Sequence, residues 1–78
     1  MRVRTLRLVR GETMQPHQQR VVDEKSELDE KIGKLEKFFD GPVFGALEGV
    51  EQRRLSGQFG YMKAYSCVLA ERISAFPL

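Results

Sequence analysis

The sequence predicts an all-α fold: an antiparallel αα-hairpin with a short helical turn in the connection, assembling as a homo-oligomer. Two apolar stripes support this prediction, one through residues 21–39 and one through residues 55–76. Each repeats in steps of three and four residues, the spacing of one helix face. If the two helices fold back on each other, Val21 lies opposite Leu69, and the polar interruptions Lys25 and Ser66 also meet. Because two independent irregularities fit one alignment, the pattern favours antiparallel pairing.

The first helix is expected to begin at Pro16 and to run to about Phe39. Proline suits the first helical turn, where its missing N–H costs nothing, and either Gln15 or Thr13 would be the preceding cap. The sequence Asp-Gly-Pro at 40–42 should end the helix, since glycine accepts a positive φ and the residue before proline avoids the α region.

A single apolar turn is expected in the connection, from Val43 to Leu47, packed over the end of the hairpin. Gly49 gives a second break in the pattern. The second helix should then run from about Val50 to Phe76, before Pro77. Together these elements make residues 14–78 one helical hairpin domain.

Residues 1–13 are expected to form a separate basic arm, either disordered or a short strand. Four arginines alternate imperfectly with apolar residues there, and Gly11 breaks the pattern. On the first helix, Glu27 with Lys31 and Glu30 with Lys34 have the i,i+4 spacing of ion pairs on a solvated face. No stretch of about 18 apolar residues and no cleavable leader is visible, so we expect a cytoplasmic protein without membrane contact.

Self-association is expected because the chain is small. A chain of 78 residues buries only about 60% of its unfolded surface, and such scaffolds need additional stabilisation. Cys67 is the only cysteine, so an internal disulfide is excluded, and no Cys/His cluster could hold a zinc ion. The second helix carries a stripe of small residues that would serve as the oligomer interface: Gly57, Gly60, Ala64 and Cys67. Two alternatives for the glycines are room for a flat ligand and a local kink.

The polar layer of Lys25 and Ser66 has two interpretations. Polar residues in a helix interface often fix register and oligomeric state. Alternatively, Lys25, Ser66 and the neighbouring Tyr65 could line a cavity that holds an anion attached to an aromatic group. Arg20 and Arg72 lie roughly 9 Å along the helices from this layer, so they could reach the same end of the hairpin.

The sequence offers little for catalysis. In the predicted register, His17 lies about two turns from Cys67, too far for a nucleophile and its base. No phosphate-binding loop, metal cluster or carboxylate dyad appears, so we expect neither enzymatic activity nor a cofactor. The pattern does not favour nucleic-acid binding, because the first helix is acidic and no continuous basic face is visible.

The stretch from Met14 to Phe39 resembles a family of small phage proteins, common in tailed phages including crAss-like ones, whose members are mostly labelled uncharacterised. The second half carries the resemblance in three segments: Gln58-Phe59-Gly60-Tyr61-Met62, Tyr65-Ser66 and Leu69-Ala70-Glu71-Arg72-Ile73. In size and architecture this family is similar to phage sponges, which trap the cyclic nucleotides made by host CBASS or Thoeris immunity. The match spans residues 14–76, so the arm is not covered.

The resemblance implies a non-enzymatic sponge, active in the host cytoplasm, that binds a cyclic di- or oligonucleotide between protomers. Arg20, Lys25 and Arg72 would then contact phosphates, and Tyr61 and Tyr65 would stack on bases. Hydrogen bonds would come from Gln19, Gln58 and Ser66. Two other functions stay open: a coiled-coil-like adaptor that binds a host or phage protein, and an accessory protein that binds nucleic acid through the arginine arm.

Overall fold

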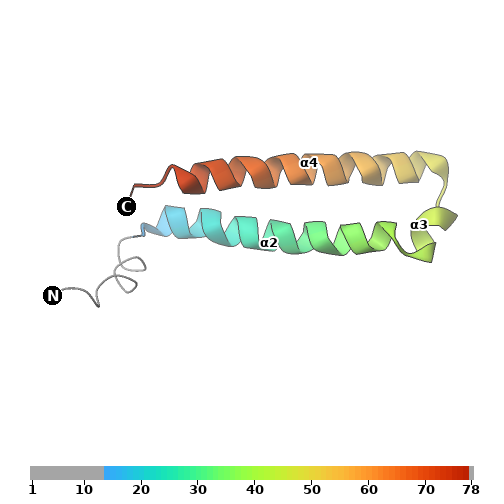
Figure 1. Cartoon of the computed structure of the whole chain (residues 1–78), viewed down its shortest axis with the longest axis horizontal. Helices are drawn as coiled ribbons and strands as arrows, with labels where there is room; N and C mark the ends of the chain where they lie inside the picture. Colours follow the sequence, from blue (N-terminus) through green and yellow to red (C-terminus); the bar gives the residue numbers. More distant parts are fainter. Residues whose placement is uncertain (1–13, 78) are drawn as a thin grey trace.

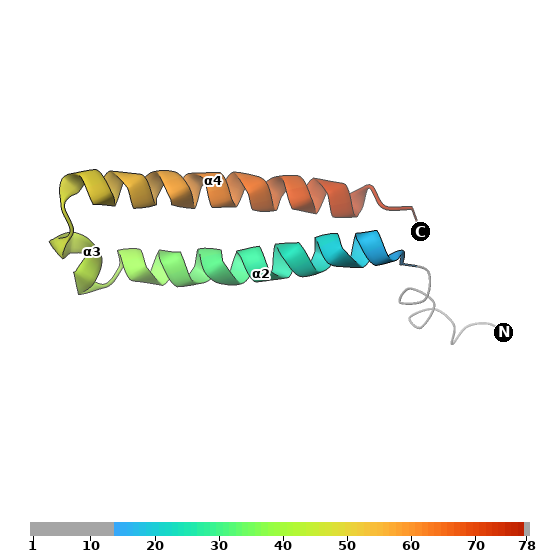
Figure 2. The ribbon, with the colours of Figure 1, turned by 180° about the vertical axis from the view of Figure 1, so that it is seen from behind.

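The computed structural model describes residues 14–77, and all their regular structure is helical. Helix α2 (Pro16–Phe39) is followed by the short α3 (Pro42–Ala46) and by α4 (Gly49–Ser74). Helices α2 and α4 lie side by side and run in opposite directions, with α3 at the end where the chain reverses (Figures 1 and 2). The all-α class is therefore confirmed, while the predicted arm of residues 1–13 lies outside the described part.

The N-terminal end of α2 agrees with the sequence prediction, whereas its C-terminal end differs from it. Gln15 is the N-cap, and its backbone N–H donates to Oε1 of the buried Gln18 at 2.8 Å. The predicted left-handed glycine at the C-terminus is wrong, because Gly41 has a φ of −90° and no described residue has a positive φ. Gly41 is instead the extended N-cap of α3, the conformation that the following Pro42 requires.

An aromatic cluster holds α3 against the two long helices. The Phe44 ring packs edge-to-face on Phe39 with centroids 4.8 Å apart, and also contacts Phe38 at 6.3 Å. Phe39 in turn contacts Phe59 of α4 at 5.0 Å. Gln52 of α4 donates a hydrogen bond of 2.9 Å to the carbonyl oxygen of Phe44. One turn of helix is thus fixed by contacts with both of its neighbours.

Helix α4 ends at Ser74, two residues before the predicted boundary at Phe76. The N–H of Ala75 bonds to the carbonyls of Glu71 and Arg72, and the N–H of Phe76 bonds to Ile73 at 3.1 Å. These short-range bonds close the last turn, so Phe76 lies beyond the helix but stays half-buried.

The apolar core between α2 and α4 is thin. Val21 and Leu69, which the sequence pattern places opposite each other, are the only buried apolar side chains among residues 14–77, with exposed fractions of 6% and 0%. The remaining apolar members of the two stripes are half-buried: Leu28, Ile32, Leu35, Phe39, Leu55, Phe59, Met62, Ile73 and Phe76. A pair of helices buries one face of each, which leaves the outer face of α4 open to water.

Candidate functional site

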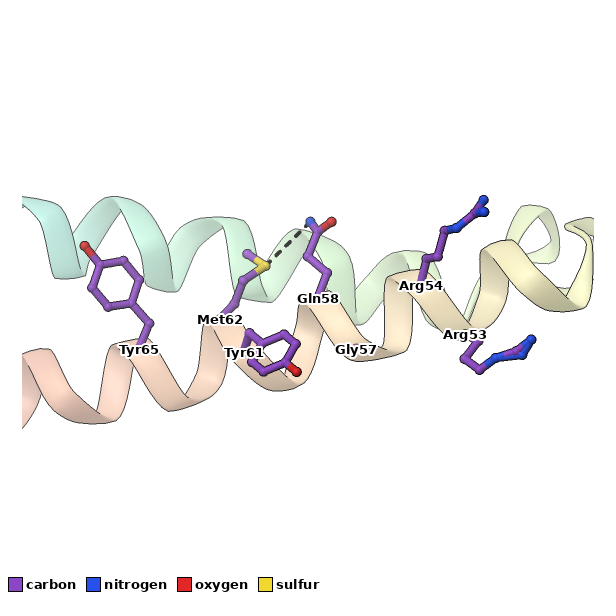
Figure 3. A pocket seen from close by; sticks show the side chains of 7 residues that line it. All are labelled: Arg53, Arg54, Gly57, Gln58, Tyr61, Met62 and Tyr65. Atoms are coloured by element: carbon purple, nitrogen blue, oxygen red, sulfur yellow. Dashed lines mark hydrogen bonds between the residues drawn. The ribbon is translucent and has the colours of Figure 1, made fainter.

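A shallow groove of about 580 Å³ runs along the flank of α4, beside its contact with α2 (Figure 3). It is lined by Arg53, Arg54, Gly57, Gln58, Tyr61, Met62 and Tyr65. Figure 3 shows Gly57 without a side chain between two sets of neighbours, with Arg54, Gln58 and Tyr65 directed toward α2. Arg53 and Tyr61 are directed to the opposite side of the groove (Figure 3). Cationic, aromatic and amide groups therefore flank one open glycine.

Helical spacing explains why these seven residues share a face. Arg53, Gly57, Tyr61 and Tyr65 follow each other in steps of four, and Arg54, Gln58 and Met62 form a parallel row with the same step. Residues four apart on a helix lie one above the other, so the two rows become two ridges. A Cβ built on Gly57 meets no atom within 4 Å, which makes this position the low point of the groove.

The side chains of the groove have few partners in the described part of the chain. Tyr61 is 80% exposed and Tyr65 is 44% exposed, although large aromatic rings are usually covered. Arg54 makes an ion pair of 3.2 Å with Glu51, whereas Arg53 has no ion pair within residues 14–77. Gln58 Nε2 lies 3.8 Å from Met62 Sδ. The rings and guanidinium groups are thus accessible to a ligand.

A second polar arrangement joins α2 to α4, in the layer where the sequence predicts Lys25 opposite Ser66. Lys25 Nζ donates to Ser66 Oγ at 3.1 Å and to Asp29 Oδ2 at 2.6 Å. Ser66 Oγ, which is buried, donates to the other carboxylate oxygen of Asp29 at 2.5 Å. The pairing of Lys25 with Ser66 is confirmed, and we call Lys25, Asp29 and Ser66 the polar layer.

Asp29 changes the electrostatics of the polar layer. Hydrogen bonds from Lys25 and then from Ser66 lower the pKa of the Asp29 carboxyl below its ordinary value, with the charge of Lys25 as a smaller cause. The carboxylate is therefore ionised and neutralises Lys25. Asp29 thus holds the position beside Lys25 and Ser66 that the second interpretation assigns to a ligand anion. Sequence reasoning missed this role, although the i,i+4 spacing of Lys25 and Asp29 was visible.

The predicted ligand residues fall into three places. The groove gathers Gln58, Tyr61 and Tyr65, and the polar layer gathers Lys25 and Ser66. Gln19, Arg20 and Arg72 are exposed outside both, with Gln19 Nε2 bonded to Asp23 Oδ1 at 2.9 Å. Arg53 and Arg54 were missed as candidates, and their signal is the repeated step of four that leads from them to the tyrosines.

The predicted interface residues are all exposed on α4: Gly57, Gly60, Ala64 and Cys67. A Cβ at Gly60, as at Gly57, meets no atom within 4 Å. The glycines are thus not needed for the contact between α2 and α4.

The ion pairs predicted on the outer face of α2 are wrong. In the described part of the chain the ion pairs are Lys25–Asp29 and Arg54–Glu51, and neither Glu27 nor Glu30 reaches its lysine. Exposed side chains gain little from such pairing, because water solvates each charge separately.

Neither a membrane span nor a metal site emerges from residues 14–77. No helix there has the length and apolarity to cross a bilayer. No group of three His, Cys, Asp or Glu side chains gathers there to hold a metal ion.

Comparison with known proteins places the chain in a phage family. The chain is 40% identical over 63 residues to an uncharacterised 7.5 kDa protein of the denB-rIIB intergenic region of Enterobacteria phage T4, a match that covers 81% of this chain and 98% of that protein. No solved structure matches. The predicted resemblance to a small phage family is confirmed at this level. A family profile described as Sequestin matches residues 15–75, and it covers both long helices, the groove and the polar layer; the chain belongs to the Sequestin family.

Proposed function

We propose that this protein is a phage sponge that binds and sequesters a cyclic di- or oligonucleotide signal of host immunity without cleaving it. The observation that carries the proposal is the groove on α4, where exposed tyrosine rings and arginines flank an open glycine. The Sequestin family name agrees with a sequestering role, and the relative in phage T4 agrees with action inside an infected cell.

The chemistry of the groove suits such a ligand. Tyr61 and Tyr65 offer ring faces on which bases can stack, and Arg53 and Arg54 offer planar groups that match phosphate oxygens. Two charge-assisted contacts at roughly 1.5–3 kcal/mol each and two stacked bases at roughly 1–3 kcal/mol each sum to about 5–12 kcal/mol, a range that includes micromolar affinity. A binding protein therefore needs no catalytic group here.

A homo-oligomer of αα-hairpins would complete the site. One copy leaves the groove open along the flank of α4, and a nucleotide bound there stays half in water. The exposed stripe of small residues beside the groove allows close approach of a second helix. In the proposed assembly a second copy covers the ligand, which shields its phosphates and strengthens each contact.

Calorimetric titration with 3′,3′-cyclic GMP-AMP, cyclic di-AMP, cyclic di-GMP and cyclic tri-AMP tests the proposal. At least one should bind with a Kd near or below the micromolar range. Tyr61→Ala and Arg53→Ala should each weaken binding at least tenfold, and Lys34→Ala on α2 serves as the charge-matched control that leaves it unchanged. Native mass spectrometry of protein from infected cells should show the retained nucleotide. Failure of the whole panel to bind at about 100 μM would overturn the proposal.

An oligomeric adaptor for a host or phage protein is the second candidate. The exposed apolar side chains Val50, Tyr61 and Val68 on α4 favour it, because such surface is typical of protein contacts. In that case no nucleotide binds, and Tyr61→Ala disrupts capture of the protein partner instead.

A further inference from the structure

The polar layer contains the Lys25 ammonium group, which could bind an anionic ligand, and the Asp29 carboxylate, which repels one. Lys25 Nζ uses two of its three N–H donors, one on Asp29 and one on Ser66. Its third donor has no partner within residues 14–77, and the Lys25 side chain is 26% exposed. An anion can therefore approach Lys25 from the solvent side.

Asp29 is held in this layer only by polar contacts, one from Lys25 of its own helix and one from Ser66 of α4. Its side chain is 46% exposed and lies one helical turn from Lys25, so this is a solvent-accessible pair within a single helix. Such pairs contribute little to stability, because water replaces the lost partner. The carboxylate can rotate into water without breaking any apolar contact of the thin core.

The polar layer also lies next to the groove. Ser66 directly follows Tyr65, and Figure 3 shows the Tyr65 hydroxyl directed from α4 toward α2. A ligand that stacks on Tyr65 brings its phosphate to this side of the groove. If Asp29 withdraws, Lys25 Nζ and the Ser66 hydroxyl are two donors for that phosphate, and they replace the two bonds they now make to the carboxylate.

We propose that Asp29 is a built-in competitor that occupies Lys25 and Ser66 in the empty protein and must be displaced by a ligand phosphate, so that this carboxylate sets the affinity of the site. The proposal rests on the proposed function. The carboxylate and a phosphate cannot both lie against one ammonium group, because two like charges about 4 Å apart repel even in water. Asp29 therefore neutralises Lys25 when no ligand is bound. It selects ligands whose phosphate contacts, together with their other contacts, are strong enough to displace the carboxylate.

The test compares Asp29→Asn with Asp23→Asn in the full-length protein. Both variants remove one exposed carboxylate from α2, but Asp23 bonds only to Gln19 within the described residues. Asp29→Asn should bind cyclic di-GMP or 3′,3′-cyclic GMP-AMP about fivefold more tightly than Asp23→Asn, with a steeper dependence on salt. It should do so although its thermal midpoint falls, since the bond from Ser66 of α4 and the bond from Lys25 of α2 both lose their charged acceptor. Asp29→Glu retains the charge and should bind as the unmodified protein does.

A purely structural role for Asp29 predicts the opposite combination, a lower midpoint with unchanged or weaker binding, and that result would overturn the proposal. Binding by the unmodified protein with no difference between the two variants would also overturn it, while the proposed function stands. Binding by Asp29→Asn alone would support it and refute the proposed function for the natural chain. If neither the natural chain nor Asp29→Asn binds any nucleotide, both are wrong.

Discussion

Lys25 of α2 and Ser66 of α4, 41 positions apart in the chain, are joined by a hydrogen bond of 3.1 Å from Nζ to Oγ. Both residues interrupt apolar stripes, and Asp29 binds the two of them at once. The polar residues that interrupt the two stripes thus form a directional contact between the helices. Apolar layers alone would tolerate a shift of one turn, whereas this contact exists in one register only.

Ser66→Ala should lower the free energy of unfolding by about 1 kcal/mol, because it removes both interhelical bonds of a buried hydroxyl. In a domain of this size the thermal midpoint should fall by about 4–8 °C. Circular dichroism during heating measures the change. Ser56→Ala, at an exposed position of the same helix, is the matched control and should leave the midpoint unchanged or slightly higher. Equal effects at both positions would refute a special role for the polar layer.

Stability should fall at acidic pH through Asp29. The pKa of this carboxyl is lowered in the folded chain, so its ionised form stabilises folding above the pKa of the unfolded chain. That contribution is lost as the pH falls through the folded pKa, below about pH 4. Urea unfolding between pH 2 and pH 7 should therefore show a smaller acid loss for Asp29→Asn than for the natural chain. Parallel curves would contradict the assigned hydrogen bonds.

Two substitutions at Gly60 test the stability of the single chain and its assembly separately. Gly60→Ala should stabilise the chain by about 1 kcal/mol, because the added Cβ meets no atom within 4 Å and glycine is a poor helix former. Gly60→Leu should leave the helices intact and dissociate the oligomer, as sedimentation velocity would show. Gly33 of α2 is equally open, so Gly33→Ala should stabilise the chain without any effect on assembly. A monomeric natural protein at micromolar concentration would refute the proposed oligomer.

The aromatic cluster should contribute to stability through Phe39, which contacts both Phe44 and Phe59. Phe39→Leu keeps an apolar side chain but loses two edge-to-face contacts, so unfolding should become easier by about 1–2 kcal/mol. Phe76→Leu is the control, since this half-buried ring has no aromatic partner in the described residues. Denaturant unfolding of both variants measures the difference, and similar losses would show that ring geometry matters little.

Removal of residues 1–13 should leave helicity and the thermal midpoint unchanged. The contacts described above that join the helices lie within residues 14–77, from Val21 against Leu69 to the aromatic cluster at α3. Circular dichroism of the shortened chain tests this expectation. Loss of the fold would show that the arm pairs with the helical domain.

Periodicity by itself determined the helices, their breaks and the layer in which Lys25 meets Ser66. It could do so because each of these features depends on spacing along one chain: a step of three or four places residues on one face, and prolines near the breaks limit the backbone. The antiparallel alignment followed from two irregularities that had to coincide. The position of Pro16 left two candidates for the N-cap, Gln15 and Thr13, and the structure shows that it is Gln15.

Tertiary structure alone decided how the polar and cationic groups are used. Asp29 neutralises Lys25 because side-chain rotamers bring its carboxylate to the ammonium and to the Ser66 hydroxyl together. The groove gathers Arg53 and Arg54 with the tyrosines because it runs along the flank of α4 beside the contact with α2, where α2 leaves these side chains open (Figure 3). Spacing shows which residues share a face, but whether that face is covered, and which neighbour satisfies a charge, depends on how two helices rotate about their axes when they pack.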